Sequence, residues 1–178
     1  MKKNSVFIAT SIDGYISDRN GNIDWLHAIP NPENNDMGYT EFINRIDALI
    51  MGRVTFETVL AFDIDWPYQI PVFVLSNTLK NVPKHLERSA FIVNGTLKNI
   101  VEQLHEKGLY RLYIDGGTTI KNFLKEDLID ELILTTMPIL LGGGATLFDE
   151  LPNELEFELS HSKIYLIQVT QTHYRRKK

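Results

Sequence analysis

Three short apolar segments of the sequence are each followed by small polar or glycine residues that could bind phosphate. These residues are Gly52-Arg53-Val54-Thr55, Ser76-Asn77-Thr78 and Asp115-Gly116-Gly117-Thr118-Thr119-Ile120. Glycine allows the backbone to approach a ligand closely, and the unpaired N–H groups that open a helix attract an anion. Each segment could equally be a tight turn followed by a helix cap. Two helix starts of this character in one cleft would suit a ligand with a diphosphate bridge.

The composition excludes several other kinds of chemistry. The 178 residues include no cysteine, which excludes disulfides, thiolate metal sites and a cysteine nucleophile, and no metal site is expected. There is neither a G-x-G-x-x-G motif after the first expected strand nor a P-loop. The formal net charge of −5 argues against nucleic acid as a partner. The one basic run, Arg175-Arg176-Lys177-Lys178, is interpreted as a solvated chain end.

The same patterns indicate one domain, residues 1–178, located in the cytoplasm. No apolar run approaches the roughly 20 residues that cross a membrane, so no membrane partner is expected. The apolar residues that follow Lys2 and Lys3 stop too soon for a signal peptide.

Apolar segments rich in β-branched residues alternate with segments of helical periodicity over most of the chain. Strands are expected at residues 6–10, 15–16, 48–51, 72–75, 91–93, 112–114, 132–139, 155–161 and 164–174. Helices are expected at residues 36–45, 53–60, 97–107 and 118–125. Ser162-Lys163 is expected to turn the last hairpin, and residues 17–35 to form a long loop.

Strands that alternate with helices imply βαβ units and a mostly parallel sheet. The run of strands at the C-terminus implies an antiparallel edge hairpin. The expected fold class is therefore α/β, with three layers and a mixed, mostly parallel central sheet. Ligands of such sheets bind beyond the carboxyl ends of the strands, where the three polar segments fall.

Four motifs in this order resemble the dihydrofolate-reductase superfamily, and most closely the branch that contains the reductase domain of riboflavin biosynthesis. Together they span nearly the whole chain and are specific only as an ordered set. The motifs are Ser11-Ile12-Asp13-Gly14-Tyr15-Ile16, Met51-Gly52-Arg53-Val54-Thr55-Phe56-Glu57, Asp115-Gly116-Gly117, and Pro138-Ile139-Leu140-Leu141-Gly142-Gly143-Gly144 with Leu147-Phe148.

The resemblance implies NADPH as the cofactor. It implies that Arg53 selects NADPH over NADH, because a guanidinium group can bind the extra phosphate. It also implies a cis peptide between Gly116 and Gly117. The implied cofactor residues are Ala9 and Ile16 at the nicotinamide, Gly52, Arg53 and Thr55 at the phosphates, Ser76 and Asn77 at the adenosine ribose, and Gly116, Gly117, Thr118, Thr119 and Ile120 across the diphosphate.

Two acidic residues are catalytic candidates by the same resemblance. Asp36 stands at the start of the helix that follows the long loop, where dihydrofolate reductases carry an acid beneath the substrate ring. A helix cap is the alternative for Asp36, and Glu41 is a weaker candidate acid. Asp115 precedes the two glycines as in riboflavin-type reductases, although an aspartate at a strand end also caps turns.

Asp13, Trp25 and Thr135 are the expected substrate-binding residues. Trp25 resembles a loop tryptophan that closes the substrate pocket, and Thr135 resembles a threonine that partners the catalytic acid. Trp25 could equally anchor the core. The loop from Ser17 to Asn35 is expected to act as a lid over the cleft.

The leading hypothesis is an NADPH-dependent reductase of a small pterin- or pyrimidine-like heterocycle. The alternative is a nucleotide-binding, catalytically lapsed dimeric module of the same fold. A homodimer is expected in either case, and Tyr165, Leu166, Ile167 and Val169 could form its surface or belong to the core.

Overall fold

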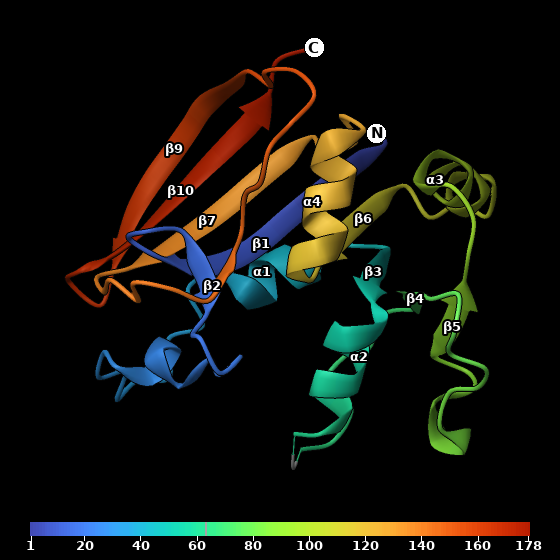
Figure 1. Cartoon of the computed structure of the whole chain (residues 1–178), viewed down its shortest axis with the longest axis horizontal. Helices are drawn as coiled ribbons and strands as arrows, with labels where there is room; N and C mark the ends of the chain where they lie inside the picture. Colours follow the sequence, from blue (N-terminus) through green and yellow to red (C-terminus); the bar gives the residue numbers. More distant parts are fainter. Residues whose placement is uncertain (63) are drawn as a thin grey trace.

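The computed structural model describes residues 1–62 and 64–178 and has an eight-stranded sheet at its centre (Figure 1). The strand order is β5–β4–β3–β6–β1–β7–β10–β9. β10 is antiparallel to both β7 and β9, and the other neighbours are parallel. The predicted mixed, mostly parallel sheet with an antiparallel C-terminal hairpin is therefore confirmed.

The elements follow the predicted order, and most bounds agree within two residues. The strands are β1 Lys3–Ser11, β2 Tyr15–Ser17, β3 Ala48–Gly52, β4 Val72–Leu75, β5 Ala90–Val93, β6 Arg111–Asp115, β7 Glu131–Met137, β8 Ala145–Thr146, β9 Phe157–Tyr165 and β10 Val169–Arg176. The α-helices are α1 Tyr39–Ile43, α2 Arg53–Leu60, α3 Leu97–Glu106 and α4 Gly117–Lys125, with 3₁₀ turns η1 Asp24–His27 and η2 Lys84–Leu86. The short β8 was not predicted, and it pairs with β2 in a small separate sheet.

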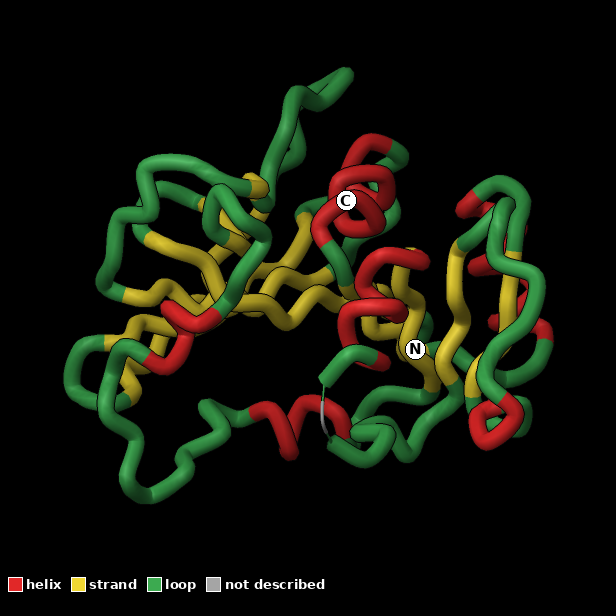
Figure 2. The backbone as a smooth tube through the Cα atoms, turned by 60° about the horizontal axis from the view of Figure 1, so that its bottom comes forward, coloured by secondary structure: helices red, strands yellow, loops and turns green. Residues whose placement is uncertain are grey.

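The helices cover both faces of the large sheet, which gives the expected three layers (Figure 2). Side chains along a strand alternate between the two faces. Leu49 and Met51 of β3 join apolar residues of α1 and α2 in one buried cluster. Ala48 and Ile50 of the same strand join apolar residues of α3 and α4 in the other. These two buried clusters therefore hold α1 and α2 on one face of the sheet and α3 and α4 on the other.

The last hairpin turns at residues 166–168, so the prediction of a turn at Ser162-Lys163 was wrong. Both predicted turn residues lie inside β9. Leu166 and Ile167 make the turn with φ values of 48° and 69°, in the left-handed region that favours glycine and asparagine. Apolar residues in this conformation give no turn signal in a sequence, which explains the error.

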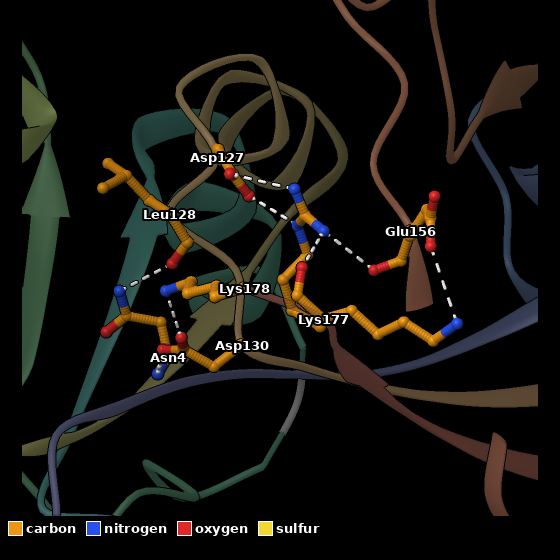
Figure 3. A network of polar contacts seen from close by, with 8 residues as sticks. Asn4, Asp127, Leu128, Asp130, Glu156, Lys177 and Lys178 are labelled. Atoms are coloured by element: carbon orange, nitrogen blue, oxygen red, sulfur yellow. Dashed lines mark hydrogen bonds and ion pairs between the residues drawn. The ribbon is translucent and has the colours of Figure 1, made fainter. Parts of the chain in front are cut away.

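The basic C-terminus is largely exposed to solvent, as the interpretation of a solvated chain end expects, but it is also held in place by side-chain contacts. Arg176 belongs to β10, and its Nε donates to Asp127 at 2.7 Å. Lys178 Nζ donates to Asp130 at 2.6 Å, and the same carboxylate accepts the N–H of Asn4 at 2.8 Å (Figure 3). The end of the chain is therefore tied to its first strand by ion pairs and hydrogen bonds.

Over the residues that the structure describes, every helix is too short or too polar to cross a bilayer.

Candidate active site

A cavity of about 400 Å³ opens at the carboxyl ends of β3 and β6, between the starts of α2 and α4. The first turns of both helices form its walls, so their unpaired N–H groups and positive dipole ends lie beside the same cavity. The structure thus brings together two segments that are more than sixty residues apart in the sequence. The lining residues from the two helix starts are Gly52, Arg53, Val54, Thr55, Gly117, Thr118 and Thr119.

Two glycines at the start of α4 leave space for neighbouring side chains. A Cβ atom on Gly116 would collide with the side chain of Thr55, and one on Gly117 would lie 2.6 Å from Ile16 Cδ1. Gly116 also has a φ of 89°, which disfavours any other residue. Side chains at these two positions would fill the space that the glycines leave open beside Thr55 and Ile16.

A second cavity of about 420 Å³ extends the first toward the ends of β4 and β5. Ser76 and Asn77 line it, as the resemblance implies for the adenosine end of a cofactor. Ser76 also has a structural contact, because its Oγ accepts the N–H of Leu79 at 2.8 Å. The two cavities form one groove, since they share the lining residues Arg53, Leu75 and Asn122.

A third cavity of about 440 Å³ continues the groove in the other direction, past Thr55 and Gly117, which line both. Ala9 of β1 and Asp115 and Gly116 at the end of β6 also line it. Residues of α2 and of the loop that contains η1 form the other sides. The predicted lid segment thus contributes to the wall of this cavity.

Asp115 is the acidic side chain at this end of the groove. Its Oδ1 accepts the N–H of Gly116 at 2.8 Å. Burial raises the pKa of the Asp115 carboxyl, and the hydrogen bonds from Gly116 and from the Tyr113 hydroxyl only partly oppose that shift. Burial and the nearby charge of Asp115 also raise the pKa of Tyr39 to about 12. A carboxyl group that keeps its proton to an elevated pH is suited to general acid chemistry.

Asp36 lies in the loop before α1 and does not line any part of the groove. Helix α1 begins at Tyr39, later than predicted. The carboxylate of Asp36 accepts the N–H groups of Gly38 at 2.9 Å and Thr40 at 2.8 Å. Hydrogen bonds from the side chain and backbone of Thr40, and from Gly38, lower the pKa of Asp36. These contacts satisfy N–H groups at the start of α1, whose N-cap residue is Gly38, and the catalytic role of Asp36 stays a prediction.

Asp13 also lies outside the groove lining, against the prediction of a substrate contact. Its carboxylate accepts the Ser11 hydroxyl at 2.6 Å and the N–H of Gly142 at 2.8 Å. The hydrogen bond from Ser11 is the main reason that the pKa of Asp13 is lowered. Asp13 therefore holds the glycine-rich loop against the turn between β1 and β2.

Trp25 and Thr135 belong to a separate buried region. Trp25 is 8% exposed and packs with Met137 and Val169, which is the core-anchor alternative. Thr135 is buried, and its Oγ1 accepts a hydrogen bond from Gln171 Nε2 at 2.9 Å. Neither residue lines the groove.

Two further expectations from the resemblance are corrected by the backbone of α4. Ile120 is fully buried in the core between α4 and the sheet and has no surface in the groove. The peptide between Gly116 and Gly117 is trans, as are all peptides of the described residues. Gly116, with φ of 89° and ψ of 134°, makes the sharp turn without a cis bond.

Many lining residues escaped the prediction, and Tyr113, Lys121 and Tyr68 are three of them. Tyr113 lies two positions before Asp115 in β6, so strand periodicity could have placed it on the same face. Lys121 lines the first cavity from α4, and its Nζ donates to Thr146 Oγ1 at 3.0 Å. Helical spacing from Thr118 could have indicated it. Tyr68 comes from the irregular segment between α2 and β4, where no periodic pattern exists.

Relatives with high sequence identity cover the whole chain. The YwjB protein of Bacillus subtilis strain 168 is 36% identical over 175 residues, which are 97% of both chains. A crystal structure from Shewanella sp. PV-4, provisionally assigned to riboflavin biosynthesis, is 55% identical, with a TM-score of 0.97 and full coverage of both chains.

More distant solved structures share the fold alone. The diaminohydroxyphosphoribosylaminopyrimidine deaminase/5-amino-6-(5-phosphoribosylamino)uracil reductase of Thermotoga maritima is 14% identical, with a TM-score of 0.76. That match covers 99% of this chain and 57% of the Thermotoga chain. Dihydrofolate reductase of Enterococcus faecalis, solved with NADP(H), is 15% identical, with a TM-score of 0.66 over 99% of this chain and 97% of that chain.

The dihydrofolate-reductase fold predicted from the ordered motifs is thereby confirmed. The model of the RibD C-terminal domain family matches residues 3–169. The chain belongs to the RibD C-terminal domain family.

Proposed function

We propose that this protein is an NADPH-dependent reductase that transfers a hydride to a pterin- or pyrimidine-like heterocycle. The observation that carries the proposal is the continuous groove, in which two helix starts face each other and Asp115 lies at one end. Family membership supports it, because the Thermotoga relative is named as a pyrimidine reductase and the Enterococcus relative holds NADP(H).

The residues of the groove fit a dinucleotide. A Cβ atom has no room at Gly116 or Gly117. The absence of side chains at these two positions would let the backbone contact a diphosphate directly. Thr55 and Thr118 add hydroxyl donors beside the two helix starts. Arg53 Nη1 donates to Glu57 at 2.9 Å, which uses one of the three guanidinium nitrogens and leaves others for a phosphate. NADPH, when bound, would supply the hydride.

The other residues would prepare the reaction. Asp115 lines the cavity and would act as the general acid toward a ring nitrogen of the substrate, because burial raises the pKa of its carboxyl. The apolar side chains around it exclude water, which strengthens each polar contact inside the cavity. Asp36 has no part in this proposal, since its carboxylate caps α1.

Titration with NADPH and NADH tests the proposal through Arg53→Ala. A hydrogen bond to a charged group contributes about 1.5–3 kcal/mol, so the loss of the guanidinium should raise the Kd for NADPH about tenfold or more. The Kd for NADH should change less than about threefold, because that cofactor lacks the extra phosphate. Quenching of protein fluorescence would report both constants.

Arg88→Ala is the matched control, because Arg88 is exposed and lies outside the groove lining. It should leave both constants unchanged. Equal weakening of NADPH and NADH by Arg53→Ala would remove Arg53 as the selector. Absence of NADPH binding to the unaltered protein would end the proposal, and binding without turnover of any heterocycle would favour the catalytically lapsed module.

We also propose that the chain acts as a homodimer. The support is β9, a strand of nine residues at one edge of the large sheet. An exposed edge strand of this length can pair with a second chain.

A further inference from the structure

Charge is distributed unevenly along the groove. The two cavities at the cofactor end are lined by basic side chains, Arg53 in both and Lys121 in the first. The third cavity is lined mainly by apolar side chains of β1, α2 and the loop around η1. Among the described residues that line this third cavity, Asp115 is the single side chain with a formal charge.

Basic side chains of the neighbouring segments pair with other groups. Arg53 pairs with Glu57. Lys121 donates to Thr146 of β8 at 3.0 Å. Arg19, in the loop that precedes η1, donates to the carbonyl oxygen of Gly142. None of these three side chains lines the third cavity.

We propose that the part of the third cavity not taken by the nicotinamide at Ala9 and Ile16 takes an uncharged, planar heterocycle that carries no phosphate group. This inference rests on the proposed reductase function and names the class of its substrate. A phosphate dianion placed among apolar side chains would lose its hydration without gaining a cationic partner, which is strongly unfavourable. The substrate named for the Thermotoga relative, a phosphoribosylaminouracil, carries such a dianion.

Polar atoms of the cavity suit the edge of a neutral ring. The hydroxyl groups of Thr55, Thr58, Tyr68 and Tyr113 and the carboxyl of Asp115 belong to the lining. The Tyr113 hydroxyl donates its proton to the carbonyl of Phe7 at 2.9 Å. A few placed polar groups within an apolar wall are typical of small-molecule sites, and the volume of about 440 Å³ lies in their range.

Paired ligands test the inference. The probes are 5-amino-6-ribosylaminouracil and its 5′-phosphate, and a panel of uncharged pyrimidines and pterins accompanies them. Calorimetry on the protein saturated with NADP⁺ gives each Kd, and NADPH oxidation gives each kcat/KM. The uncharged nucleoside should bind at least tenfold more tightly than its phosphate and should have the higher kcat/KM. A phosphate ester that binds as well or better, or no binding by any uncharged ring, would overturn the inference.

The variant Thr58→Lys adds a cation to the cavity wall. Thr58 lies on the exposed part of α2 and lines the third cavity, so a lysine there has room to extend. It should reduce the preference for the uncharged nucleoside at least threefold. Thr170→Lys, on an exposed position of β10 outside the groove, is the matched control and should leave the preference unchanged. An unchanged ratio in Thr58→Lys would overturn the electrostatic basis of the inference.

The outcomes separate this inference from the function on which it rests. A protein that fails to bind NADPH contradicts the proposed reductase function. A protein that binds NADPH and prefers the phosphorylated ligand retains the reductase function and contradicts the substrate class alone.

Discussion

Asp115 is the residue at which stability and function oppose each other. Burial raises the pKa of its carboxyl, so the folded chain holds this proton more tightly than the unfolded chain does. The folded state is therefore favoured below the ordinary aspartate pKa of about 4, and that advantage is lost as the pH rises toward the raised value. Asp115→Asn should raise the melting temperature at pH 8, and the gain should shrink at pH 4.

The same substitution should lower kcat while the Kd for NADPH stays within about twofold, because an amide cannot donate the proton that an acid supplies. Thermal unfolding at both pH values and steady-state kinetics on one sample would measure these effects. Asp36→Ala is the contrasting variant: the loss of its cap should cost about 1 kcal/mol and leave kcat unchanged. A larger loss of kcat in Asp36→Ala than in Asp115→Asn would reverse the assignment of the acid.

Among individual residues, the sequence predicted which ones line the groove better than it predicted the positions of Asp13 and Asp36. Gly52, Arg53 and Thr55 line the groove because a strand end and a helix start are local features that a sequence encodes. Asp13 and Asp36 bond to backbone groups nearby, and a sequence does not show whether a carboxylate faces a ligand or its own loop. Tertiary contacts decide between those two outcomes.

Glu131 shows how one buried charge joins two strands of the sheet and the segment that follows α1. It begins β7 and accepts hydrogen bonds from Lys3 and Ser5 of β1 at 2.7 and 2.8 Å and from Arg45, just beyond α1, at 2.9 Å. Burial would raise the pKa of Glu131, but the hydrogen bonds from Lys3 and Ser5 and the charge of Arg45 lower it overall. Its ionised form therefore stabilises the fold above the ordinary glutamate pKa.

Glu131→Gln should reduce the free energy of unfolding by about 2 kcal/mol at pH 7, since hydrogen bonds to charged groups contribute about 1.5–3 kcal/mol. The difference in the free energy of unfolding between the variant and the unaltered protein should narrow as the pH falls through the lowered pKa of Glu131. At that pH the unaltered protein also loses the stability that the ionised Glu131 provides. Urea unfolding at pH 7 and at pH 3.5 would measure both. Glu158→Gln, which breaks an exposed pair with Arg175, is the control and should cost less than about 1 kcal/mol.

The order of the helices and strands was predictable because hydrophobic periodicity is a local property of the sequence. The position of the turn in the last hairpin was not predictable. Its turn contains Leu166 and Ile167 in the left-handed region, where residue type argues against a turn. Val169 is fully buried and Leu166 packs near Trp25, so burial of apolar groups accompanies the strained backbone. The register of β9 on β10 is thus fixed by tertiary contacts that no short window of sequence contains.

The molecule as a whole is organised by the strands that lie at the two ends of the chain. β1 pairs with both β6 and β7, and β10 pairs with β7, so the N-terminal and C-terminal segments meet within the sheet. Ion pairs of the last residues, such as Lys178 with Asp130, reinforce this junction. The groove lies at the carboxyl ends of β3 and β6 and beside β1, which places a rigid sheet beneath the site.

We place the surface of the proposed homodimer on β9, which includes Tyr165 of the residues first considered for it. Val169 is buried, whereas Leu159 and Ile164 are 60% and 66% exposed. They pair opposite Tyr174 and Thr170, which places both on one face of the sheet. β9 has nine residues and the other edge strand, β5, has four, so β9 offers the longer row of backbone groups to a second chain.

Light scattering coupled to size exclusion should therefore give about twice the chain mass of 20.5 kDa. The double variant Leu159→Lys with Ile164→Lys should elute as a monomer, because two facing lysines would repel their symmetry mates across the axis. Phe91→Lys, on β5, is 40% exposed in the unaltered chain and should remain dimeric. A monomer in every case would refute the homodimer, and dissociation by Phe91→Lys alone would move the interface to the opposite edge of the sheet.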